Sequence, residues 1–174
     1  MVPETSDPFR TVSLSGFEPP SRESPVALTV EVTRPHVTPE STAEVEISLT
    51  WDGKQPVSFF SGEGFPLIVP KTSTPRGVVL TDATRSFDRT TDRPECWKPN
   101  LPADDAFGYG LGLLKVDSEP GETHSTTVSL WSDHQVDGCL EPGEYTFRES
   151  VSYQSADADE PTVDEYRFTL RIER

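Results

Sequence analysis

The sequence has few lysines, one methionine, two cysteines and no long hydrophobic run. Its 174 residues contain 15 Lys and Arg against 30 Asp and Glu, which gives a net charge of -15. A chain of this charge repels phosphate backbones and anionic lipid surfaces, so the sequence argues against nucleic acid and membranes as partners. The acidic residues are spread along the chain and make no tail. We therefore interpret them as a solvated surface, and the composition resembles that of halophilic proteins.

The sequence also shows no pattern typical of a membrane anchor or of a signal peptide. No run of 18 apolar residues exists, and residues 1–12 lack both the basic start and the apolar segment of a signal peptide. We therefore expect a cytoplasmic location. Cys96 and Cys139 leave an alternative open, because a disulfide between them suits an extracellular or assembly-associated protein better than a cytosolic one.

The sequence carries no catalytic signature. A nucleophilic enzyme needs a Ser or Cys beside a base, and none of the three histidines lies in such a signature. Ser132, Asp133 and His134 are adjacent, but neighbouring side chains point in divergent directions and no G-x-S-x-G elbow is present. Cys96, Cys139 and His134 do not form the four-ligand pattern of structural zinc. We therefore expect a non-enzymatic protein without a metal or cofactor.

Short alternating runs of apolar and polar residues make up most of the chain. In Val26–Arg34 and Ala43–Trp51, every second residue is apolar, which is the pattern of half-buried strands. Seven or more such runs occur, and no amphipathic helix is indicated. We predict a single β-sandwich domain over residues 26–174. The proline-rich residues 1–25 are predicted to form a loosely held arm, with one ordered piece at 12–17.

Two Pro-Gly-Glu triplets mark turns that open strands. They begin at Pro120 and Pro142 and frame the strand that contains Trp131. The second turn belongs to a tyrosine corner, in which a Tyr hydroxyl bonds to upstream backbone where the chain crosses between two sheets. Its residues are Leu140, Pro142, Gly143 and Tyr145. The corner favours an all-β, immunoglobulin-like antiparallel β-sandwich.

Residues 82–110 interrupt this pattern with one long loop. A structureless loop of this length is uncommon in a compact domain unless it has a function or is fastened. Cys96 and Trp97 are candidate anchors. A Cys96–Cys139 disulfide would close some 40 residues and stabilise the fold by roughly 3 to 4 kcal/mol. Two free thiols remain the alternative in a reducing cytosol.

The order of these features resembles the BsuPI-type intracellular proteinase inhibitor family. An aliphatic strand leads to a Phe-containing strand ending near Ser-Gly, and a later Gly-Glu leads to a Trp and then to Pro-Gly-x-Tyr. The resemblance covers roughly residues 26–172, while the long loop and the N-terminal arm depart from the family pattern. The matching residues are Phe59 or Phe60, Ser61, Gly62, Phe65, Gly121, Glu122, Trp131, Pro142, Gly143 and Tyr145.

The resemblance implies a protein that binds subtilisin-type serine proteases without turning over a substrate. Inhibitors present a stiff, exposed loop to the protease. Two candidate loops are present, and the first is a predicted hairpin made of Ser61, Gly62, Glu63, Gly64 and Phe65. The second contains Arg93 and Trp97. A structural or surface module of a larger assembly is the alternative function, and the sequence leaves the oligomeric state open.

Overall fold

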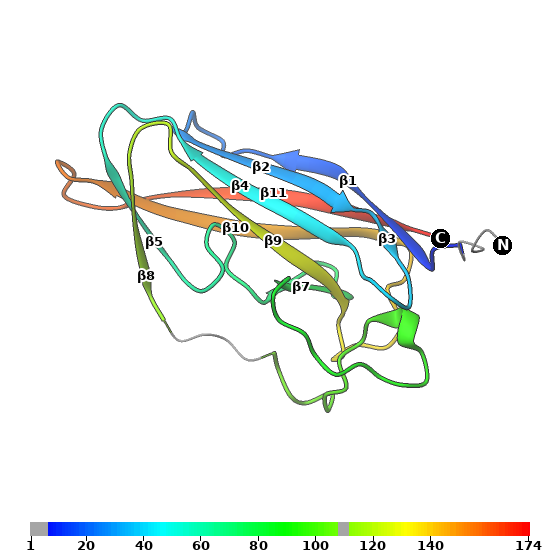
Figure 1. Ribbon diagram of the computed structural model, residues 1–174. Helices are drawn as coiled ribbons and strands as arrows, with labels where there is room; N and C mark the ends of the chain where they lie inside the picture. The colour runs from blue at the N-terminus through cyan, green and yellow to red at the C-terminus, as the bar shows by residue number, and fades with distance from the viewer. Residues whose placement is uncertain (1–6, 108–111) are drawn as a thin grey trace.

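The structure is a computed structural model that describes residues 7–107 and 112–174. Its strands form two antiparallel sheets that pack face to face (Figure 1). Sheet A has the strand order β3-β1-β11-β10-β5-β8, and sheet B has the order β2-β4-β9-β7-β6. The predicted antiparallel sandwich of immunoglobulin-like class is confirmed. The strands are β1 (Arg10–Glu18), β2 (Val26–Arg34), β3 (His36–Val37), β4 (Glu44–Trp51), β5 (Val57–Ser61), β6 (Lys71–Thr72), β7 (Val78–Asp82), β8 (Leu114–Ser118), β9 (Thr123–Ser132), β10 (Gly143–Ser155) and β11 (Thr162–Glu173).

The alternating pattern of the strands places the core between the two sheets. In β4, Val45, Ile47 and Leu49 are fully buried, while the residues between them are only half-buried. Phe147 of β10 lies opposite Phe168 of β11, and their rings stack inside the sandwich with centroids 5.2 Å apart. Burying a large apolar side chain stabilises a fold by about 1.5–3 kcal/mol, so the alternation decides which face of each strand turns inward.

The N-terminal segment is ordered where an ordered piece was predicted, at residues 12–17, but this piece is a strand of the sandwich and not part of a loose arm. Arg10–Glu18 forms β1, which pairs with β11 over seven residue pairs and with β3 on its other side. Val12 is 1% exposed in the core, so this segment belongs to the sandwich and the predicted domain boundary at residue 26 is corrected. The many prolines near β1 suggested a loose arm, but the strand itself contains none. Residues 1–6 lie outside the described residues.

The segment after β5 also differs from its prediction. The chain does not continue as a hairpin strand through residues 65–69, because β5 takes β10 and β8 as its neighbours. Residues 62–70 instead form turns that bring Leu67 and Val69 into the core from the side. The apolar run is therefore largely buried, but as irregular chain whose Leu67 and Val69 belong to the core.

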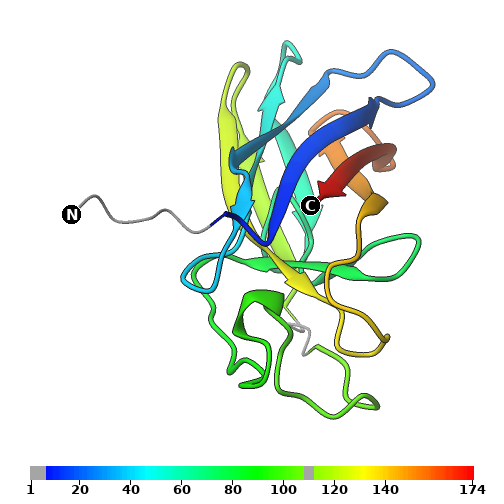
Figure 2. The same cartoon turned by 90° about the vertical axis from the view of Figure 1, so that its right-hand side faces the viewer.

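The long loop gathers at one end of the sandwich. It starts after β7, contains the short 3-10 helix η1 (Pro94–Cys96) and lies beside the segment that follows β9 (Figure 2). Gly108 and Gly110, which belong to this loop, lie outside the described residues. Among the residues that the structure describes, no helix is long and apolar enough to cross a membrane.

Candidate functional site

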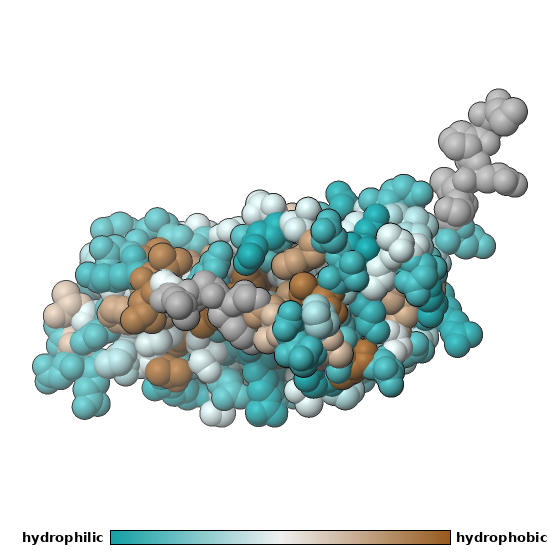
Figure 3. Space-filling model, turned by 90° about the horizontal axis from the view of Figure 1, so that it is seen from below, coloured by the Kyte–Doolittle hydropathy of each residue, from teal (hydrophilic) through white to brown (hydrophobic). Residues whose placement is uncertain are grey.

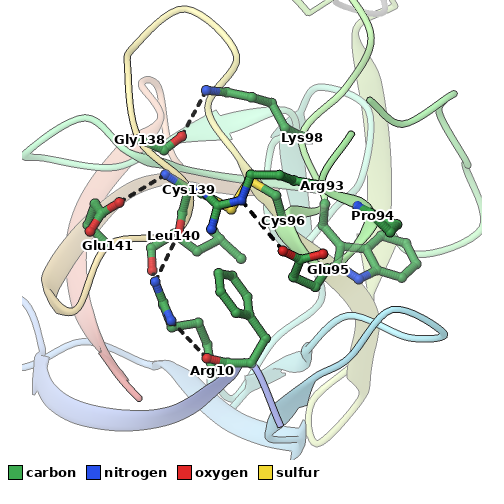
Figure 4. Close-up of a disulfide and its surroundings, with 12 residues drawn as sticks. Arg10, Arg93, Pro94, Glu95, Cys96, Lys98, Gly138, Cys139, Leu140 and Glu141 are labelled. Carbon is green, nitrogen blue, oxygen red and sulfur yellow. Dashed lines mark hydrogen bonds and ion pairs between the residues drawn. A yellow bond between two sulfur atoms is a disulfide. The ribbon is translucent and has the colours of Figure 1, made fainter. Parts of the chain in front are cut away.

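A disulfide fastens the long loop to the residues before the tyrosine corner. The sulfurs of Cys96 and Cys139 are bonded at 2.06 Å, and both residues are 2% exposed (Figure 4). The Lys98 ammonium reinforces the junction by donating to the carbonyls of Val136 and Gly138 at 3.1 and 2.8 Å. The loop is therefore held at its centre by a covalent bond and by hydrogen bonds across the same junction.

An aromatic cluster packs the long loop against the sandwich. Trp131 of β9 contacts the rings of Phe87 and Trp97 edge-on, each with centroids 5.3 Å apart. Phe107 packs against Phe87 at 5.3 Å and against the ring of His134 at 5.0 Å. The loop thus has a small aromatic core of its own, which explains how so long an irregular segment stays compact.

The tyrosine corner lies next to the disulfide, and a residue of the N-terminal strand β1 hydrogen-bonds to it. The Tyr145 hydroxyl donates to the Glu141 carbonyl at 2.6 Å, and Leu140 adopts the left-handed conformation with φ of 47°. The buried Arg10 of β1 donates from Nε to the Leu140 carbonyl at 2.7 Å (Figure 4). Burial lowers the pKa of Arg10, although the nearby Glu141 carboxylate opposes this shift. These contacts are architectural, because each ends on backbone.

The structure gives different roles to Arg93 and Trp97, the two candidate contact residues of the long loop. The Arg93 side chain is 53% exposed and pairs with Glu95 at 3.5 Å, so it is available to a partner. Trp97 instead donates from Nε1 to the Thr38 carbonyl at 2.6 Å, and the Arg89 guanidinium covers its ring at 4.0 Å. Trp97 is therefore an anchor of the loop, and Arg93 is the exposed member of the pair.

The loop of Ser61, Gly62, Glu63, Gly64 and Phe65 is a stiff turn. Its backbone is closed by hydrogen bonds from Leu67 to the Gly64 carbonyl at 3.0 Å and from Val69 to the Glu63 carbonyl at 3.2 Å. Gly64 has φ of 92°, and a Cβ there would lie 2.6 Å from the Leu67 carbonyl, so only glycine fits. Phe65 packs on Phe59 and His124, which leaves Glu63 as the exposed residue of the turn.

Two buried carboxylates fix irregular segments to sheet A. The Asp164 carboxylate, whose side chain is 1% exposed, accepts hydrogen bonds from Arg22 at 2.7 and 3.0 Å, Ser24 at 2.6 Å and Tyr153 at 2.7 Å. Burial opposes the ionisation of Asp164, but the donors outweigh burial and lower its pKa. This network holds the connection between β1 and β2.

Glu149 holds the segment before β6 to sheet A in the same way. Its carboxylate accepts from the Ile68 amide at 2.9 Å and pairs with the Lys71 ammonium at 2.9 Å. Burial raises the pKa of Glu149, and the charge of Lys71 partly opposes that shift. Both carboxylates occupy inward positions of strand patterns, so an acidic residue on an apolar strand face was the sequence signal for them.

The neighbouring residues Ser132, Asp133 and His134 point to three different environments. The Asp133 carboxylate pairs with Arg76 at 2.8 Å, and His134 Nε2 hydrogen-bonds to the Asp105 carbonyl. The residues do not form a relay, as expected for consecutive positions. No group of three or more His, Cys, Asp or Glu side chains within 7–107 and 112–174 is arranged to hold a metal ion.

Exposed apolar side chains gather where β5 and β8 form the open edge of sheet A. Of the seven large apolar side chains exposed in the described ranges, three lie in β5 or β8 or directly before β8, and a fourth lies on β11 across β10 from β5. Figure 3 shows hydrophobic side chains at the end of the molecule where Figure 1 places β5 and β8. We call these four residues the edge surface: Phe60, Leu113, Leu114 and Val163, which are 40%, 94%, 45% and 57% exposed.

The strand pairing places Phe60 and Val163 on one face of sheet A, on either side of β10. Phe60 and Val163 both lie opposite Ser152 of β10, one from each side, so their side chains project from the same outer face. Leu114 lies opposite Ser61, the first residue of the stiff turn, so its side chain projects from the other face of the edge formed by β5 and β8. Sequence reasoning missed the edge surface as a unit, because Leu113 and Val163 are far apart in the chain.

Comparisons with known proteins give no assignment. No family model matches the chain, and no curated protein matches it either. The function is therefore argued from the geometry described above.

Proposed function

We propose that the chain is a non-enzymatic protein-binding domain whose partner contacts the edge surface. The observation that carries this proposal is the exposure of Phe60, Leu113 and Leu114 at the open edge of sheet A, with Val163 across β10 from Phe60, on a chain with a net charge of -15. Grouped apolar residues on a polar surface are typical of interaction sites. Large apolar anchors at the centre of an interface carry most of its binding energy.

The backbone of β8 adds a second means of recognition. β8 pairs with β5 on one side only, so its other side offers unpaired amides and carbonyls in the described structure. An extended segment of a partner can add to such an edge, with main-chain hydrogen bonds giving affinity and side-chain contacts giving specificity. Lys115 and Asp117 flank the apolar positions and guard the edge against self-association.

We further propose a subtilisin-type serine protease as the partner, because the sequence resembles the BsuPI-type intracellular proteinase inhibitors. The stiff turn beside the edge surface supports this proposal, since it presents Glu63 on a backbone that loses little freedom on binding. Arg93 on the disulfide-fastened loop is a second exposed contact, at the other end of the fold.

Titration into hydrolysis assays of subtilisin-type proteases tests the proposal. We expect inhibition that reaches a limit at a fixed ratio of the two proteins, and a Phe60→Thr, Leu113→Ser double variant is expected to inhibit at least about tenfold less well. The matched control is Leu14→Ser, which removes an apolar side chain of β1 that is about as exposed as Phe60, at 39% against 40%. Unchanged hydrolysis at excess chain would remove the inhibitor proposal, and equal losses for both variants would remove the edge surface.

A module of a larger extracellular assembly is the second candidate, and the buried Cys96–Cys139 disulfide favours it. Disulfides persist in oxidising compartments and are rare in the cytosol. Thiol labelling of the chain, taken directly from its source under acid quench, distinguishes the two settings. Unreactive cysteines together with a high native mass support the assembly module, whereas labelled cysteines on a monomer support the intracellular inhibitor.

A further inference from the structure

A hollow of about 280 Å³ lies on the outer face of sheet A, away from the edge surface. β1, β10 and β11 form it, together with Thr74 from the segment after β6. Arg148 in this hollow lies four positions along β10 from Ser152, the residue opposite Phe60 and Val163, which is roughly 13 Å of strand. The hollow is thus a separate feature of the same outer face.

Two arginines stand side by side in the wall of the hollow. Arg148 of β10 and Arg167 of β11 are directly opposite in the strand register. Like charges at opposed positions destabilise a sheet, so the pair calls for a neighbouring anion. Arg167 shares its charge with Glu165 at 3.3 Å, whereas the Arg148 guanidinium makes no hydrogen bond or ion pair to any residue that the structure describes.

The floor of the hollow consists of hydroxyl groups. Thr146 Oγ1 and Thr169 Oγ1 are hydrogen-bonded at 2.9 Å, which leaves one hydroxyl hydrogen of the pair for a ligand. The Thr74 backbone closes one side through two hydrogen bonds with Thr146, at 2.8 and 2.9 Å. The floor is therefore fixed by backbone contacts on both of its strands.

A glycine keeps the floor open. Gly16 of β1 lies opposite Thr169 at a bulge, and a Cβ at Gly16 would lie 3.7 Å from both Cβ and Oγ1 of Thr169. That distance is an ordinary contact, so packing does not require glycine at this position. A methyl group there would instead cover the hydroxyl floor beneath the two arginines.

We propose that this hollow binds a carboxylate group of a protein partner. Arg148 and Arg167 supply planar, bidentate donors that match a carboxylate, and the threonine pair supplies a third donor from below. Glu18 lines the β1 side and lies opposite Arg167 in the strand register, so its carboxylate disfavours a second negative charge in the hollow. A singly charged carboxylate, from an Asp or Glu side chain or from a chain terminus, fits this arrangement better than a dianion.

The surrounding charge predicts how salt acts on this site. The net charge of -15 repels an anion at long range, while the contact with the arginines is short-range. Salt screens charges separated by more than about 10 Å at 0.1 M, so added salt weakens the repulsion more than the contact. Carboxylate binding is therefore expected to persist when the salt concentration rises.

Amide NMR titration of the full chain tests the proposal with three small probes. N-acetylglutamic acid amide carries a side-chain carboxylate, N-acetylalanine carries a terminal carboxylate, and inorganic phosphate carries neither. We expect saturable shifts of Gly16, Thr146 and Thr169 at roughly millimolar concentrations of one or both carboxylate probes. The stronger of the two probes identifies the source of the carboxylate. Absence of saturable shifts at these residues, or binding of phosphate alone, would overturn the proposal.

Three variants separate the hollow from general surface charge. Arg148→Gln and Gly16→Ala are each expected to weaken carboxylate binding by about tenfold, the first by removing a donor and the second by covering the floor. Arg171→Gln is the matched control, because Arg171 projects from the same face of β11 and pairs with Glu144. Equal weakening by Arg171→Gln would mean diffuse charge and would overturn the proposal. This outcome is independent of whether the edge surface binds a partner.

Discussion

Replacing Asp164 by Asn tests how the fold uses a buried charge. The wild-type carboxylate has a 1% exposed side chain and accepts hydrogen bonds from Arg22, Ser24 and Tyr153. An asparagine side chain has nearly the same shape but only one acceptor oxygen and no charge. At least part of the network therefore loses its acceptor while the packing is retained.

The loss in the free energy of unfolding depends on which donors are left unpaired. The Arg22 side chain is 58% exposed and regains water, so its loss contributes little. The Tyr153 hydroxyl is buried, and the Ser24 hydroxyl is partly buried, so both lose charge-assisted hydrogen bonds. Such bonds contribute about 1.5–3 kcal/mol each, and a remaining amide oxygen restores part of this, which gives a net loss of about 2–4 kcal/mol. For a domain of this size, the melting temperature falls by roughly 5–15 °C.

Urea unfolding at several pH values measures the effect. The pKa of Asp164 is lower in the folded than in the unfolded state, so its stabilisation is present above pH ~4 and is lost as pH falls through the folded pKa. The wild type and the Asn variant should therefore differ most near pH 7 and converge in acid. Glu165→Gln, an exposed neighbour, is the control. A loss below about 0.5 kcal/mol, or one that does not shrink in acid, would refute the reasoning.

Three further predictions concern other buried groups. Replacing Cys96 and Cys139 by Ser should lower the free energy of unfolding by about 4 kcal/mol for a sequence separation of 43, measured by urea unfolding; an unchanged midpoint would contradict this. Burial and the hydrogen bond to Asp164 raise the pKa of Tyr153 to about 12, so its stabilisation is lost as pH rises from ~10 through 12. The stability difference between wild type and Tyr153→Phe should then shrink from pH 9 to pH 12, and a constant difference would speak against the contact. Lys71→Met should destabilise by about 3 kcal/mol at neutral pH and less in acid, because burial raises the pKa of Glu149 and the unpaired carboxylate becomes neutral there. Equal losses at both pH values would exclude that cause.

The sandwich could be predicted because its signals are local. The alternation in Val26–Arg34 and Ala43–Trp51 depends only on burial of every second residue, and these segments pair as β2 and β4. The tyrosine corner is also local, since the Tyr145 hydroxyl reaches a carbonyl only four residues upstream. Such features follow from neighbouring residues and a single turn.

Other features depend on partners far away in the chain. β1 is a strand because β11 lies beside it, and 154 positions separate Ser15 from the Thr169 carbonyl to which its hydroxyl bonds. Glu149 stands on the apolar face of its strand, but the alternation does not name Ile68 and Lys71 as the groups that satisfy it. The irregular segments were therefore the part that sequence reasoning placed least well.

The same limit applies to the candidate sites. The sequence named Trp97 both as an anchor of the long loop and, with Arg93, as a partner contact, and only the contacts of Trp97 with the Thr38 carbonyl and Trp131 decide for the anchor. The edge surface and the hollow beside Arg148 and Arg167 both arise where strands distant in sequence lie side by side. Neither was visible before the register of sheet A was known.

Amide hydrogen exchange, recorded with and without a partner, shows whether the edge of sheet A at β8 is the binding surface. The partner is a subtilisin-type protease whose catalytic serine has been replaced, so that it binds without cleaving. We expect slower exchange in Leu114–Ser118 and in the adjoining stiff turn, and unchanged exchange in β2 on the opposite sheet. Exchange that stays the same throughout the chain, or slows only around Arg93, would contradict binding at this edge.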